Sequence, residues 1–64
     1  MIRINGEEVQ VLGMTITEYL KAKGYRAEVV AVELNGEIIP RDSFSAVRFA
    51  DGDSVEVVRF VGGG

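Results

Sequence analysis

Apolar and polar residues alternate in two short stretches near the start of the chain, and again in two stretches near its middle. Each pair of stretches is separated by an Asn-Gly dipeptide, at Asn5-Gly6 and at Asn35-Gly36. A type I′ turn requires positive φ at both central residues, and Asn-Gly meets this at the least steric cost. The pattern therefore predicts two β-hairpins, the second ended by Pro40, which cannot donate to a ladder. The four predicted arms are residues 2–4, 8–11, 30–34 and 37–39.

One helix is predicted between the two hairpins. Thr15 and Glu18 have the spacing of a capping box, in which each side chain accepts a hydrogen bond from the other residue's backbone N–H. Gly24 is placed to end the helix in the left-handed conformation. The apolar stripe of this helix, which should face the core, consists of Ile16, Tyr19 and Leu20.

The second half of the chain predicts a helical turn over residues 41–46, with Phe44 in the core, and a tight turn at 51–53. A last strand, 54–61, is followed by the glycines of 62–64. The resulting order, β-β-α-β-β-β, predicts an α+β fold in which one main helix covers one face of a small mixed sheet. We expect residues 1–61 to form the domain and 62–64 to form a flexible tail.

The last predicted strand carries apolar residues on both of its faces. Val55 and Val57 share one face, whereas Val58 and Phe60 share the other. A central strand can be buried on both faces. A single short helix can hardly cover both faces of a sheet, so we favour an exposed apolar surface that docks on a protein partner, formed by Val58, Phe60 and the adjoining Val61.

Composition excludes several classes of function. The chain has 64 residues, enough for a single domain, and contains neither Cys nor His. Disulfides, thiolate nucleophiles and the usual zinc ligands are therefore missing, and we expect neither intrinsic catalysis nor a bound metal or cofactor. The net charge of −3 disfavours nucleic acid, and no apolar span suggests a signal peptide or membrane helix. We expect a cytoplasmic monomer that binds proteins, including one with a basic surface.

Several motifs together resemble the ThiS family of sulfur carriers over the whole length of the chain. Each motif alone is a weak signal, but their order and spacing match the family. The motifs are Asn35-Gly36-Glu37, Ile38-Ile39-Pro40-Arg41, Asp51-Gly52-Asp53 and the terminal Phe60-Val61-Gly62-Gly63-Gly64. The resemblance implies a ubiquitin-like β-grasp fold, which the family shares with MoaD, the carrier of molybdopterin synthesis.

The resemblance also implies a chemical role for the end of the chain. In the family, a ThiF-like adenylyltransferase attaches AMP covalently to the carboxylate of the terminal glycine, here Gly64. A sulfur donor, such as a cysteine desulfurase system, then converts the acyl-adenylate to a thiocarboxylate. Thiazole synthase receives that sulfur in thiamin biosynthesis. The chain would thus be a protein co-substrate rather than an enzyme.

The chemistry of the tail agrees with this role independently of the resemblance. Glycines at a terminus are often no more than a frayed end. Here, however, Gly62, Gly63 and Gly64 follow an apolar strand directly. Because glycine has no Cβ, such a tail can enter a channel too narrow for other residues. The terminal carboxylate is also the group that adenylylation would activate.

Three other functions remain open at the level of the sequence. A MoaD-like carrier would use the same chemistry with a different recipient, although such chains are typically longer. A ubiquitin-like modifier would be joined to lysines of target proteins. A non-catalytic β-grasp binding module, such as an RNA-binding domain, would carry a passive tail, and deletion of the glycines would distinguish it from a carrier.

Overall fold

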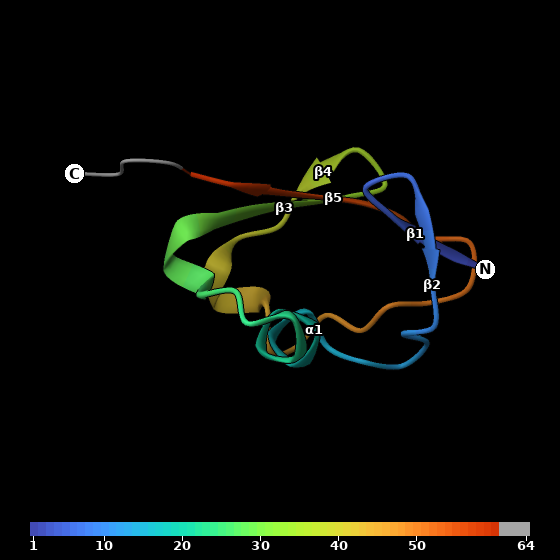
Figure 1. Ribbon diagram of the computed structural model, residues 1–64, viewed down its shortest axis with the longest axis horizontal. Helices are drawn as coiled ribbons and strands as arrows, with labels where there is room; N and C mark the ends of the chain where they lie inside the picture. Colours follow the sequence, from blue (N-terminus) through green and yellow to red (C-terminus); the bar gives the residue numbers. More distant parts are fainter. Residues whose placement is uncertain (61–64) are drawn as a thin grey trace.

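The computed structural model describes residues 1–60 and shows a five-stranded sheet with one α-helix under one of its faces (Figure 1). This is the expected two-layer α+β arrangement. The elements, in chain order, are β1 (Ile2–Ile4), β2 (Glu7–Val9), α1 (Ile16–Lys23), the 3₁₀ helix η1 (Ala27–Val29), β3 (Val30–Leu34), β4 (Glu37–Ile38), the 3₁₀ helix η2 (Arg41–Ser43) and β5 (Ser54–Arg59).

The last strand lies in the middle of the sheet. The strand order is β2-β1-β5-β3-β4, so β5 separates the two hairpins. It pairs in parallel with β1 and antiparallel with β3, over a register that runs from Leu34 opposite Val55 to Val30 opposite Arg59. The first and the last strand are thereby paired in one sheet. β5 reaches the edge of the molecule beside the start of β3 (Figure 1).

Both Asn-Gly turns have the predicted backbone geometry. Asn5 and Gly6 have φ values of 53° and 83°, and Asn35 and Gly36 have values of 52° and 88°. Positive φ at two successive residues is the signature of a type I′ turn, whose twist matches that of the strands it joins. The two predicted hairpins are therefore confirmed.

The side chains of the two turn asparagines also hold β5, which the turn chemistry alone does not predict. The Oδ1 atom of Asn5 accepts from the N–H of Val57 at 2.8 Å, and its Nδ2 donates to the carbonyl of the same residue at 3.2 Å. Oδ1 of Asn35 accepts from the N–H of Ser54 at 2.9 Å, and its Nδ2 donates to Asp53 at 3.0 Å. Each turn thus joins a hairpin to the central strand.

These two roles of Asn5 can be separated by substitution. Asn5→Gly keeps the positive φ but removes the amide, and should cost about 1 kcal/mol, or roughly 4–8 °C in thermal midpoint. Asn5→Ala removes the amide and also strains the turn, and should cost about 1–2 kcal/mol more. Circular dichroism melts of both variants, with the exposed Gln10→Ala as control, measure the difference. Equal midpoints for the Gly variant and the parent would show that the amide contributes nothing.

Helix α1 is capped at both ends as the sequence predicts. The Thr15 hydroxyl accepts from the N–H of Glu18 at 3.0 Å, and the Glu18 carboxylate accepts from the N–H of Thr15 at 2.9 Å. At the other end, Gly24 adopts the left-handed conformation with φ of 78°. The capping box and the glycine stop are both confirmed.

The irregular segment between η2 and β5 completes the helix N-terminus. The N–H of Ile16 donates to the carbonyl of Val47, and the N–H of Thr17 donates to that of Phe44, both at 3.1 Å. A helix leaves four N–H groups without intrahelical partners at its start. The capping box satisfies two of them and these carbonyls satisfy the other two, so no free donor is left there to bind an anion.

The core lies between the sheet and the helix. Phe44 is buried as predicted, and Phe49, which sequence reasoning did not place, packs edge-on against Tyr19 with ring centroids 5.9 Å apart. Burial raises the pKa of the Tyr19 phenol, and Tyr25 and Glu7 add to the rise, so Tyr19 is a neutral core residue. The buried apolar residues are Ile2, Ile4, Val11, Ile16, Tyr19, Leu20, Val30, Val32, Phe44, Phe49 and Val55.

The bounds of the strands differ from the sequence prediction in four places. β2 begins at Glu7 rather than at Glu8 and ends at Val9 rather than at Val11, which is buried in the core and accepts from the N–H of Met14 across the turn that follows. β4 ends at Ile38, although the N–H of Ile39 still donates to Val32 at 2.9 Å. β5 ends at Arg59. No helix within residues 1–60 has the length and apolar character needed to cross a membrane.

Candidate functional site

The point at which the chain leaves the sheet is held in place. The N–H of Phe60 donates to the carbonyl of Val29 at 2.8 Å, one step beyond the end of β5. The guanidinium of Arg59 lies over the ring of Tyr25, 5.9 Å from its centroid, a cation–π geometry. The segment that follows Phe60 therefore begins at a defined position on the edge of the molecule.

The predicted tail lies outside the described residues. Val61, Gly62, Gly63 and Gly64 follow directly on Phe60. The role of the Gly64 carboxylate, and the part of Val61 in docking, therefore stay predictions.

The exposed face of β5 is confirmed for the two residues that the structure describes. Val55 is buried against the helix side, whereas Val58 and Phe60, which alternate with it, are 55% and 52% exposed. They lie on the face of the sheet away from α1. Large apolar side chains are thus exposed at one place on a small acidic protein.

The neighbouring strands extend this surface with two residues that sequence reasoning missed. Ala31 of β3 lies opposite Val58, so both are on the same face. Ile38 of β4, 68% exposed, shares that face through its pairing with Glu33. The two-residue turn at Asn35-Gly36 fixes the pairing of Glu33 with Ile38, so the sequence already contained the signal for this shared face. We call Ala31, Ile38, Val58 and Phe60 the outer patch.

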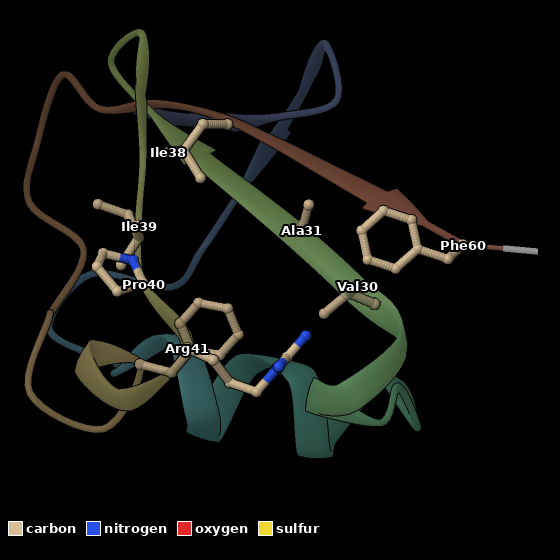
Figure 2. Close-up of a pocket in the computed structure, with 8 residues that line it drawn as sticks. Val30, Ala31, Ile38, Ile39, Pro40, Arg41 and Phe60 are labelled. Carbon is tan, nitrogen blue, oxygen red and sulfur yellow. The ribbon is translucent and has the colours of Figure 1, made fainter. Parts of the chain in front are cut away.

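A shallow groove opens beside the outer patch, with a volume of about 230 Å³. Figure 2 shows β3 on one side of it, with Val30 and Ala31, and Ile39 and Pro40 on the other side. The groove exists because Pro40 lacks an N–H and cannot continue the ladder, so the chain diverges from β3 there. The remaining lining residues are Ile38, Arg41, Phe44 and Phe60.

Arg41 closes one end of this groove and is already engaged. Its Nε donates to the carbonyl of Ala27 at 2.9 Å, and its Nη2 donates to that of Glu28 at 3.3 Å. These bonds tie η2, where Arg41 lies, to η1, which leads into β3. Two of the five N–H donors of the guanidinium thus hold the two walls of the groove together.

The described residues offer no catalytic or metal-binding constellation. Among residues 1–60 there is no group of three or more His, Cys, Asp or Glu side chains that could hold a metal ion. Asp51, in the predicted turn, pairs with the N-terminal amine. Asp53 accepts from the N–H of Ala50 at 2.8 Å, as a turn residue does. The described residues thus combine an exposed apolar patch with a fixed point at which the chain leaves the sheet.

Comparison with known families agrees with this arrangement. The model of the ThiS family matches residues 2–64. The chain belongs to the ThiS family. The match runs through the tail glycines as well as the sheet, so it covers both the outer patch and the predicted reactive end.

Solved and curated ThiS-family proteins share the fold and the length. The crystal structure of a thiamine biosynthesis protein (ThiS) from Geobacter metallireducens superimposes with a TM-score of 0.79 at 43% identity, covering 98% of this chain and 97% of that one. The sulfur carrier protein ThiS of Bacillus subtilis is 36% identical over 66 residues, which span all of both chains. The fold is therefore the ubiquitin-like β-grasp that the resemblance implied.

A third relative is much longer. A thiazole synthase of Paramagnetospirillum magneticum is 45% identical over 62 residues, which are 95% of this chain but only 19% of that protein. This ThiS-family chain therefore spans about a fifth of the length of that relative. In that relative, the segment similar to this chain is one part of a longer polypeptide.

Proposed function

We propose that this ThiS-family chain is a sulfur carrier of thiamin biosynthesis and that its reactive group is the carboxylate of Gly64. The observation that carries the proposal is the match to the ThiS family through the final glycines, residues 2–64. The full-length similarity to the Bacillus subtilis sulfur carrier supports it. The described residues add an anchored exit and an exposed patch but no catalytic group, which suits a chain that other enzymes act upon.

The proposed chemistry begins with an activation step on the adenylyltransferase. A carboxylate oxygen of Gly64 attacks the α-phosphorus of ATP, pyrophosphate leaves, and an acyl-adenylate forms. A sulfur nucleophile from the donor then attacks the acyl carbon, and AMP leaves with the electron pair of the broken C–O bond. With a persulfide donor this step gives an acyl disulfide, and a thiol then attacks the donor sulfur, so that the S–S bond breaks, the thiocarboxylate leaves and a new disulfide forms on the donor. The charges of the phosphates must be neutralised by Mg²⁺ and cationic groups of the ThiF-like enzyme.

The proposed recipient of the sulfur is thiazole synthase. The support comes from the thiazole synthase of Paramagnetospirillum magneticum, which contains a segment similar to 95% of this chain. Two modules joined in one polypeptide meet at a high effective concentration. The separate chain would have to achieve the same encounter through its docking surface.

The decisive experiment is intact-mass spectrometry after reconstitution with the adenylyltransferase, ATP, a persulfide donor and a thiol reductant. We expect pyrophosphate release and a mass increase equal to the replacement of one oxygen by sulfur. A chain made with a C-terminal carboxamide at Gly64 is the matched control, because an amide cannot form the acyl-adenylate. If the parent chain gained no sulfur, or the carboxamide gained as much, the proposed function would be wrong.

Phe60→Asp should weaken binding to the adenylyltransferase by about tenfold or more, because it places a charge in the centre of an apolar interface. The fold should be unaffected, since the Phe60 side chain is about half exposed. Isothermal titration calorimetry and a thermal melt measure the two effects. Leu12→Asp, at a site that is 72% exposed and outside the outer patch, is the control. Loss of the folded state in the Phe60 variant would show that this residue belongs to the core.

A further inference from the structure

We propose that the groove beside the outer patch receives one large apolar side chain of a protein partner, and that the same partner places a Lys or Arg against the carboxylates of Glu33 and Glu56. The proposal rests on the proposed function, because it assumes that a protein of the carrier pathway docks on this face. It identifies the chemistry of the contact, an apolar anchor flanked by a cation.

The size of the groove fits a side chain rather than a cofactor. Pockets for drug-sized ligands and cofactors span about 300–1,000 Å³. The groove measures about 230 Å³, whereas a cavity of about 150 Å³ is enough for a benzene ring. One aromatic or branched aliphatic side chain would therefore fill most of it.

The lining of the groove also favours an apolar occupant. Seven of its eight residues are apolar, and the eighth is Arg41. The Arg41 guanidinium uses two of its five N–H donors on backbone carbonyls, at 2.9 and 3.3 Å, and is held at one end of the groove. A methyl or ring carbon that enters the apolar part of the groove gains from leaving water.

The groove and the outer patch form one continuous surface. Ala31, Ile38 and Phe60 belong to both. In Figure 2, Ala31 lies between Ile38 and Phe60 along β3. A partner that covers the patch therefore passes directly over the groove, and a side chain projecting from the centre of its contact surface can enter. Such buried anchors usually dominate the affinity of an interface.

The acidic pair at the border of the patch indicates the charge of the partner. Glu33 lies directly opposite Glu56 in the β3–β5 register, and Ile38 lies on the other side of Glu33. Like charges that face each other across two strands destabilise a sheet. Within residues 1–60 neither carboxylate has an ion-pair partner. A Lys or Arg of a docked protein would supply the missing countercharge next to the apolar anchor.

The test measures binding of the unfused thiazole synthase from the same pathway, by isothermal titration calorimetry at low and at high salt. Ala31→Leu fills the groove while making the surface more apolar, and should weaken binding about tenfold or more if the groove admits an anchor. Ile38→Ala removes a lining side chain that is exposed, and so should preserve the fold while weakening binding. Leu12→Ala is the matched apolar control and should bind like the parent.

Glu33→Gln and Glu56→Gln should each weaken binding by roughly threefold to tenfold at low salt, with a smaller effect at high salt, because salt screens the attraction. Glu8→Gln makes the same change in charge on β2, beyond β1 from the patch, and should change binding less than about twofold. Folding of every variant is confirmed by its thermal midpoint.

Unchanged binding of both Ala31→Leu and Ile38→Ala would overturn the apolar anchor. Equal effects of the Glu33, Glu56 and Glu8 changes would overturn the specific cation contact. Formation of the thiocarboxylate on the adenylyltransferase is measured separately. Failure there would refute the proposed function, whereas normal sulfur loading with unaltered binding of the groove variants would refute only this inference.

Discussion

Removal of Gly63 and Gly64 should abolish formation of the thiocarboxylate and leave the thermal midpoint unchanged. Two glycines have no apolar side chain whose burial could be lost, so the free energy of unfolding should change by less than about 0.5 kcal/mol. The same deletion moves the terminal carboxylate back by roughly 7 Å of extended chain. Reacting atoms must approach to about 3.5 Å, so a shortfall of this size prevents the acyl carbon from reaching its nucleophile.

This prediction is tested by pyrophosphate release, intact mass and a melt of the truncated chain. A chain in which Gly63 and Gly64 are both replaced by Ala is the matched control, because it keeps the length and adds only two Cβ atoms. If its turnover is reduced less than that of the truncated chain, reach is the main requirement. If the Ala variant is as inactive as the truncated chain, the main requirement is the absence of Cβ atoms, as a narrow channel would demand. Normal turnover by the truncated chain would contradict the role of the glycine tail.

Phe49→Ala should have the largest effect on stability of the substitutions considered. Phe49 is only 2% exposed and packs edge-on against Tyr19. Truncation of a buried phenylalanine costs about 3–5 kcal/mol, a large part of the roughly 3–10 kcal/mol expected for a domain of this size. The thermal midpoint should fall by at least about 12 °C.

Phe60→Ala provides the matched comparison, since it removes the same side chain from a position that is 52% exposed. Its free energy of unfolding should fall by only about 1 kcal/mol, because only about half of the side chain is buried. Urea or thermal unfolding of the two variants side by side measures the contrast. Similar losses in both would mean that the two rings are equally part of the core, contrary to the structure.

Local features of this domain could be predicted from the sequence because short-range physics decides them. Asn5-Gly6 and Asn35-Gly36 must turn where they do, since few other dipeptides accept two positive φ values. Thr15, Glu18 and Gly24 mark the two ends of the helix through hydrogen bonds and a backbone conformation that involve only neighbouring residues.

The face of the last strand could also be predicted, because side chains alternate strictly along a strand. Val58 and Phe60 had to lie on the side opposite Val55. The presence of only one helix of useful length then indicated that one of these two sides stays uncovered. The strand ends were predicted less well, since they depend on where neighbouring strands stop pairing.

The remaining features depend on contacts between residues far apart in the chain, which no local pattern encodes. The amide of Asn5 meets Val57, and the Arg41 guanidinium meets Ala27 and Glu28, only because the sheet order places β5 between the two hairpins and brings η2 beside η1. The groove arises from the same cause, since it lies where the chain leaves β3. Periodicity in the sequence therefore specified the elements and their faces, whereas long-range pairing decided the neighbours of each side chain and so the shape of the docking surface.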